Sequence, residues 1–137
     1  MNDSAAGVEP ASSFKSRGGL KRLAAATAYS LRGLKAAWRH EASFRQEVIL
    51  GLLLVPVAAW LAPTLLQALA LMGAIVFVWL VELVNSAIEA LADAVSLERH
   101  PLIGRAKDIG SAAVLLSLLL AAGVWAGVLW PVLTGRP

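Results

Sequence analysis

Two long stretches without charged residues dominate the pattern of the chain. No Asp, Glu, Lys or Arg lies within 48–81 or within 109–135. The first stretch is too long for one crossing of a hydrocarbon layer, which takes about 20 helical residues, and Pro63-Thr64 interrupts it. The pattern therefore predicts three transmembrane helices, at about 42–61, at 64–83 with a helical continuation to about 95, and at 111–130.

Ahead of the first span, apolar and basic positions recur with the period of a helix. The leucines of 20–38 share one stripe with Trp38, and lysines and arginines project beside it. This pattern predicts an amphipathic helix at 17–40 that lies in the interface of an anionic leaflet. A surface helix packed on a soluble core is the alternative, although the chain offers hardly any such core. The small polar residues of 1–13 predict a disordered lead-in to a single membrane domain at 14–137.

Composition and charge favour a membrane protein over a soluble enzyme. Apolar residues make up 58% of the chain and charged residues 15%, and the mean hydropathy is +0.71. The absence of cysteine excludes disulfides and thiolate ligands, which leaves oxygen and histidine for any metal. Eleven of the twelve lysines and arginines lie at or before the first span or between the second and third. The positive-inside rule therefore places the N-terminus and residues 93–110 in the cytoplasm and the C-terminus outside. The expected fold class is an all-α polytopic membrane protein.

Four polar residues interrupt the apolar pattern at the inner end of the second span. Glu82, Asn85, Glu89 and Asp93 follow one another at offsets of 0, 3, 7 and 11, so they share one face of a helix. At about 1.5 Å per residue, Glu82 lies roughly 10 Å deeper than Glu89. A carboxylate at the edge of a span indicates a functional site. A polar seam of interhelical hydrogen bonds or a proton relay is an equal alternative.

Two further clusters flank this face in the sequence. Arg105 and Lys107 stand beside Asp108 and could hold phosphates, or simply anchor a loop on the inside. The second cluster lies at the start of the first span and consists of Glu41, Arg45 and Glu47. These side chains could cap the helix at the interface or form ion pairs. Carboxylates for Mg²⁺, cations for phosphates and a buried base are the ingredients of phosphoryl transfer. The usual nucleotide-binding signatures are missing, so the residues alone leave a non-enzymatic role open.

Three strings resemble one family. AAWRHEASFRQE (36–47), VELVNSAIEALAD (81–93) and GRAKDIGSAAV (104–114) are similar to the small prokaryotic integral-membrane diacylglycerol kinases, and the similarity runs from about Arg22 to Trp130. The resemblance implies a homotrimer in the bacterial inner membrane, with active sites shared between neighbouring subunits at the cytoplasmic interface. It also implies that ATP and diacylglycerol are the substrates and Mg²⁺ the cofactor, with no nucleic-acid partner.

The family pattern carries roles onto particular positions. It implies that Glu82 is the general base on the lipid hydroxyl, that Asn85 is a catalytically important polar residue, and that Glu41 and Glu89 hold the metal with ATP. The positions that match nucleotide contacts, besides those two glutamates, are Arg22, Tyr29, Glu98, Arg99, His100, Lys107 and Asp108. The positions that match the lipid-binding surface, besides Glu82, are Lys35, Ala36, Ala37, Trp38, Ser43, Phe44, Arg45, Gln46, Glu47 and Ser111.

One short sequence departs from the diacylglycerol kinase pattern. His100 is followed by Pro101 and Leu102, which resembles the His-Pro-Leu of the related undecaprenol kinases. The 104–114 string and the 36–47 string resemble the diacylglycerol branch instead. Diacylglycerol is therefore the expected substrate, undecaprenol the alternative, and a small membrane channel or assembly subunit a distant non-enzymatic alternative.

Overall fold

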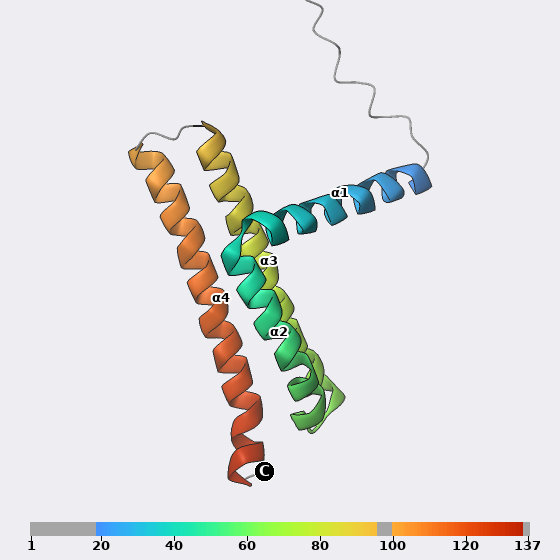
Figure 1. Ribbon diagram of the computed structural model, residues 1–137. Coiled ribbons are helices and arrows are strands. Elements are labelled where there is room, and N and C mark those ends of the chain that lie inside the picture. The colour runs from blue at the N-terminus through green and yellow to red at the C-terminus, as the bar shows by residue number, and fades with distance from the viewer. Residues whose placement is uncertain (1–18, 96–99, 136–137) are drawn as a thin grey trace, which may run out of the picture. The chain divides into compact units, whose positions relative to one another are not determined.

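The computed structural model describes residues 19–95 and 100–135, and within these ranges the chain is helical with no strand. The helices are α1 (Gly19–His40), α2 (Ala42–Leu61), α3 (Leu65–Val95) and α4 (Pro101–Thr134) (Figure 1). The predicted all-α fold is confirmed. The expectation of disorder at 1–13 falls outside the described residues.

Three of the described helices have the length and composition to cross a membrane. These are α2, α3 and α4, each of which contains a long apolar stretch with few charged residues. At about 1.5 Å per residue, the 31 residues of α3 extend roughly 46 Å, which exceeds a hydrocarbon layer of about 30 Å. The polar end of α3 therefore has the length to reach beyond the hydrocarbon.

Polar contacts mark the breaks between α1 and α2 and between α2 and α3. Glu41 adopts an extended conformation (φ −106°, ψ 112°) between α1 and α2, and Arg45 Nη1 donates to the carbonyl of Trp38 at 3.0 Å. A cation bonded to the last carbonyls of a helix stabilises that end. Before α3, Thr64 Oγ1 accepts from the Gln67 backbone N–H at 3.2 Å and lies 2.9 Å from the Gln67 side-chain oxygen. This Thr-x-x-Gln arrangement resembles a capping box and starts α3 directly after Pro63.

The start of α4 differs from the expected loop at 93–110. α3 continues to Val95 and α4 begins at Pro101, so the cationic residues near Asp108 lie on a helix. The reason is local: the His100 side chain accepts from the Leu102 backbone N–H at 3.3 Å, and proline is favoured at the first position of a helix.

The end of α4 also lies beyond the predicted end of the last span at residue 130. The helix continues through Pro131 to Thr134 and ends at Gly135, which has a positive φ of 63°. Proline removes one backbone donor, and the helix adds less than one further turn beyond it. Thr134 Oγ1 donates to the Trp130 carbonyl at 2.8 Å, which satisfies one of the last acceptors.

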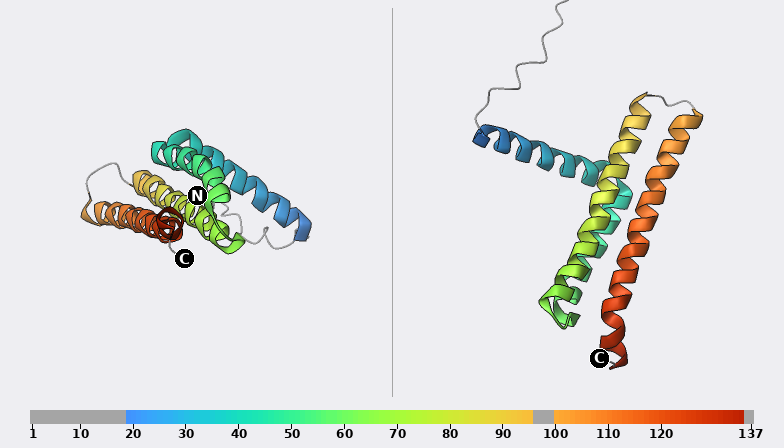
Figure 2. Two further views of the ribbon diagram at one scale, coloured as in Figure 1. Left: turned by 90° about the horizontal axis from the view of Figure 1, so that it is seen from below. Right: turned by 180° about the vertical axis from the view of Figure 1, so that it is seen from behind.

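The described residues fall into two units that meet at Lys35 and Ala36. The first contains most of α1, whose exposed leucines and basic residues carry its amphipathic pattern. In the second unit, α3 lies between α2 and α4 and packs on both (Figures 1 and 2). The α2 contact includes Gly51, where a Cβ atom would lie 2.5 Å from Trp79 Cζ2 and 2.6 Å from Ile75 Cγ2. A residue larger than glycine does not fit here without movement.

Candidate active site

One stripe of α3 changes from apolar to polar along its length. Leu71, Ile75 and Val78 are buried at spacings of three and four, and the same spacing continues to Glu82 and Asn85. This is the seam that α3 uses for helix packing. Glu82 is 4% exposed and Asn85 is 8% exposed. A carboxylate is therefore held in a packed seam near the C-terminal end of an apolar helix, where a charge is costly to place, and such a residue indicates a functional site.

Asn85 connects this seam to Glu89 and to α4. Its Nδ2 donates to Glu89 Oε1 at 3.0 Å, one helical turn away. Its Oδ1 is buried and has no hydrogen-bond partner among the described residues. That oxygen lies against Gly110 of α4, where a Cβ atom would collide with it. The lack of a side chain at Gly110 therefore gives the Asn85 amide its place between the helices.

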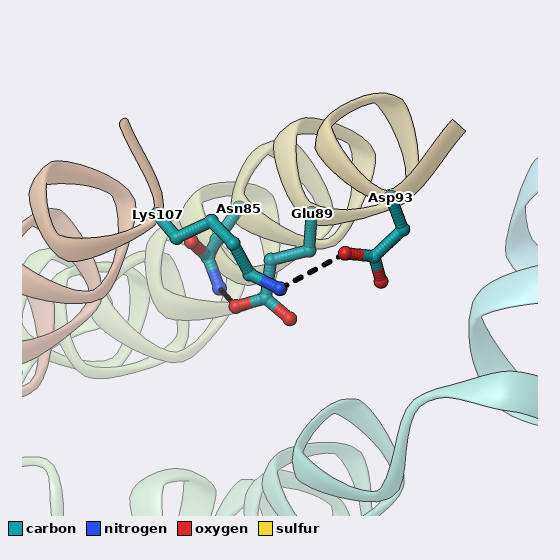
Figure 3. A network of polar contacts seen from close by, with 4 residues as sticks. All are labelled: Asn85, Glu89, Asp93 and Lys107. Atoms are coloured by element: carbon teal, nitrogen blue, oxygen red, sulfur yellow. Dashed lines mark hydrogen bonds and ion pairs between the residues drawn. The ribbon is translucent and has the colours of Figure 1, made fainter. Parts of the chain in front are cut away.

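Lys107 reaches across from α4 to the exposed end of the same face. Its Nζ lies 3.1 Å from Asp93 Oδ1, and the two side chains are 38% and 58% exposed (Figure 3). The negative charge of Glu89 also acts on this ammonium. Lys107 lies before the predicted span at 111–130. The hydrogen bond to Asp93 and the negative charge of Asp93 raise the pKa of Lys107 above its ordinary value. The ammonium form is therefore favoured beside two carboxylates.

The start of α2 brings two more carboxylates toward Glu82. Both Glu41 and Glu47 lie within electrostatic range of Glu82. The backbone carbonyl of Glu47 accepts a hydrogen bond from Trp79 Nε1 at 3.0 Å, which fixes this turn of α2 against α3. Glu47 Oε2 is buried and lacks a hydrogen-bond partner within the described residues.

An apolar groove of about 230 Å³ leads away from Glu47 between α2, α3 and α4. Apart from Glu47 its walls are apolar or aromatic, and they include Leu50, Trp79, Leu118 and Trp125. A groove of this kind matches a hydrocarbon chain in chemistry, and Glu47 is its one charged lining residue among the described residues.

The structure brings together several of the predicted site residues. Those that share one region of the second unit are Glu41, Glu47, Glu82, Asn85, Glu89 and Lys107. Phe44, which lies between Glu41 and Glu47 in the sequence, is buried. Five other predicted lipid or nucleotide residues are exposed: Trp38, Ser43, Gln46, Asp108 and Ser111. His100 caps the start of α4, and no hydrogen bond or ion pair within the described residues joins it to this group.

Other predicted residues belong to the first unit or fall outside the described residues. Arg22, Tyr29 and Lys35 belong to the first unit, in which Arg32 stacks over the Tyr29 ring at 4.6 Å. Glu98 and Arg99 fall outside the described residues. Across the described ranges, no group of three or more His, Asp or Glu side chains is arranged to hold a metal ion.

Sequence reasoning did not assign roles to three residues that the structure places here. The helical spacing places Asp93 on the polar face but assigns it no role. Gly110 and Trp79 carry no polar pattern that would distinguish them in the sequence. Their importance comes from contacts with Asn85 and Glu47 on neighbouring helices, which spacing along one helix does not reveal.

Comparison with known proteins identifies the family. Residues 28–129 match the family model described as prokaryotic diacylglycerol kinase. The chain is 46% identical over 112 residues to a diacylglycerol kinase of Escherichia coli, covering 82% of this chain and 92% of that protein. It is 48% identical over 118 residues to a diacylglycerol kinase of Pseudomonas aeruginosa, covering 86% and 96%. A Helicobacter pylori diacylglycerol kinase is 43% identical over 107 residues, covering 78% and 84%. The chain therefore belongs to the prokaryotic diacylglycerol kinase family.

Proposed function

We propose that this protein is a lipid kinase that transfers the γ-phosphate of ATP to the primary hydroxyl of diacylglycerol and so forms phosphatidic acid. The observation that carries the proposal is the polar end of the α3 seam, where Glu82, Asn85 and Glu89 follow buried apolar residues and Lys107 lies within electrostatic range of Glu89. A carboxylate base, further carboxylates and a cation are thus gathered at the end of membrane-length helices. The family membership supports the same reaction.

Glu82 is the proposed general base. It lies deepest of the carboxylates on α3, where the hydroxyl of a membrane lipid arrives at headgroup level. As the hydroxyl oxygen bonds to the γ-phosphorus, Glu82 accepts the hydroxyl proton, and the bond from the γ-phosphorus to the β–γ bridging oxygen breaks to release ADP. Asn85 positions the Glu89 carboxylate through the 3.0 Å hydrogen bond from its Nδ2 to Glu89 Oε1.

Glu89 and Glu41 are the proposed ligands of Mg²⁺. The absence of a three-residue metal cluster among the described side chains is compatible with this ion, because Mg²⁺ commonly uses one or two carboxylates together with waters and substrate phosphates. Glu89 has one carboxylate oxygen bonded to Asn85 and a second oxygen that makes no hydrogen bond with any of the described residues. When bound, the ion supplies neutralisation of the phosphate charge.

The remaining predicted contacts complete this proposal. Lys107 provides a cation for the phosphates, and further nucleotide contacts are assigned to Arg22, Tyr29, Glu98, Arg99, His100 and Asp108. The apolar groove below Glu47 supports the assignment of the start of α2 to the lipid. The lipid contacts are then completed by residues 35–38, residues 43–47 and Ser111.

We place the reaction at the cytoplasmic face of the bacterial inner membrane, in a homotrimer whose sites are shared between chains. The basic residues concentrated before and between the spans support this orientation. Three thin helices cannot enclose both a nucleotide and a lipid headgroup, so a neighbouring chain is needed to close the site.

Mixing inactive subunits tests the shared site. Glu41→Gln and Glu89→Gln chains are each expected to be nearly inactive at low Mg²⁺, and co-assembled mixtures assayed at the same Mg²⁺ concentration are expected to recover a fraction of native activity because some sites combine both intact carboxylates. Mixtures that remain inactive despite verified co-assembly would place each site within one chain.

A competition assay tests the reaction itself. Membranes that contain the protein are supplied with γ-labelled ATP, diacylglycerol and undecaprenol, and label in each extracted lipid is measured. We expect label in phosphatidic acid. Label chiefly in undecaprenyl phosphate would favour the alternative raised by His100-Pro101-Leu102, and an absence of label in either lipid would refute the kinase proposal.

A further inference from the structure

Asp93 is the outermost member of the polar face and has no role in the proposal above. It lies one turn beyond Glu89 on α3, and its Oδ1 is 3.1 Å from Lys107 Nζ on α4. The two residues are separated by 14 positions in the sequence, so this contact joins the ends of two helices. Figure 3 shows the Lys107 ammonium on the same side of α3 as the Glu89 carboxylate.

We infer that Asp93 is a positioning residue that holds the Lys107 ammonium beside Glu89, where it receives the phosphates of MgATP. The inference deepens the proposed function and rests on it. Asp93 touches neither substrate in this scheme; it acts through Lys107.

The number of donors on lysine makes the role compatible with catalysis. An ammonium group has three N–H donors, and the contact with Asp93 uses one of them. Two donors remain for phosphate oxygens while the Asp93 contact persists. A lysine side chain is otherwise flexible and must lose rotamer freedom when it binds a ligand. Restricting it beforehand reduces that loss.

A purely structural clamp between α3 and α4 explains the contact less well. Both side chains are substantially exposed, and exposed ion pairs contribute little to stability. The two helices already pack closely through Asn85 and Gly110. The Asp93 contact is therefore expected to influence where the ammonium lies much more than whether the helices stay together.

A double-mutant cycle in the full-length protein tests the inference. The proteins are wild type, Asp93→Asn, Lys107→Gln and the double variant, each measured for binding of labelled ATP with Mg²⁺, for label transfer to diacylglycerol, and for the midpoint of thermal unfolding. Glu9→Gln, which removes a negative charge from a position without a proposed role, is the charge-matched control.

We expect Asp93→Asn to raise the KM for MgATP about two- to fivefold, which is the range for a coupled ion pair at the surface. The KM for lipid and the thermal midpoint should stay at the wild-type values, and Glu9→Gln should leave all of them unchanged. In the Lys107→Gln background, Asp93→Asn should have no further effect on ATP binding. Asp93→Glu should restore most of the ATP affinity, and this comparison does not depend on the lysine variant.

Three results would overturn the inference: an unchanged or lowered KM for MgATP in Asp93→Asn, an equal effect of Asp93→Asn with and without Lys107, or a loss of affinity that follows a lowered thermal midpoint. Each of these results counts against the inference only when the wild-type protein, measured in parallel, phosphorylates lipid. If the wild type itself transfers no label to lipid, the proposed function fails instead, so the two failures are distinguished.

Discussion

Replacing Gly110 with alanine would place a methyl group where the Asn85 side-chain oxygen now lies. The obstructing atom is the end of a side chain that can rotate, so the backbones of α3 and α4 need not separate. The rotation has a consequence for Glu89, because the same amide donates to Glu89 Oε1 at 3.0 Å. We therefore expect Gly110→Ala to damage the reaction more than the fold.

The expected magnitudes follow from these contacts. A hydrogen bond to a charged group contributes about 1.5–3 kcal/mol, and each 1.4 kcal/mol or so corresponds to a tenfold change. Loss of the Asn85–Glu89 bond should thus lower kcat/KM for MgATP roughly 10- to 100-fold. Two terms change the free energy of unfolding. Moving the Asn85 side chain off its rotamer costs about 0.5–1.5 kcal/mol, while alanine is favoured over glycine in a helix by about 1 kcal/mol. These two terms nearly cancel, and the lost Asn85–Glu89 bond joins two residues of one helix at a part-buried position, so the thermal midpoint should fall only modestly.

The assay measures ATP-dependent label transfer to diacylglycerol together with thermal unfolding in the same detergent. Gly104→Ala is the matched control, because it makes the same change in the same helix at a position with open space around it. It should retain wild-type activity. If Gly110→Ala were also fully active, the position of the Asn85 amide would not govern the orientation of Glu89, and our account of this contact would be wrong.

Three further predictions concern the base, the metal and the helix packing. Glu82→Gln should abolish phosphate transfer but leave MgATP binding largely intact, because an amide fills the same space without accepting the proton; near wild-type turnover would exclude Glu82 as the base. Glu89→Gln should raise the Mg²⁺ concentration needed for half-maximal activity, and added Mg²⁺ should recover part of the loss, since the ion prefers carboxylates to amides; an unchanged Mg²⁺ titration would contradict the ligand assignment. Gly51→Ala should destabilise the protein by about 1–3 kcal/mol through overpacking against the rigid Trp79 ring. Gly73→Ala, with open space around it, is the control in the same unfolding assay, and equal stability of the two variants would refute the packing argument.

The amino-acid sequence by itself determined the helical character of the chain and the number of its long apolar helices. Burial in a bilayer requires long uncharged helical stretches, and these are visible in the sequence without knowledge of any neighbour. The polar face of α3 was also predictable, because Glu82, Asn85, Glu89 and Asp93 share a face through the helical period alone. The family strings added roles for individual positions.

The tertiary structure decided the contacts between different helices. Lys107 could have served as a topological anchor in a loop; the structure places it on α4, bonded to Asp93. Gly110 and Gly51 look alike in the sequence as small residues in apolar helices, yet one accommodates the Asn85 amide and the other accommodates Trp79. Helical periodicity fixes which residues share a face, whereas the register between two packed helices depends on the fit of all their side chains together. For that reason the sequence identified the polar face, and only the packing of α3 against α2 and α4 determined which groups it meets.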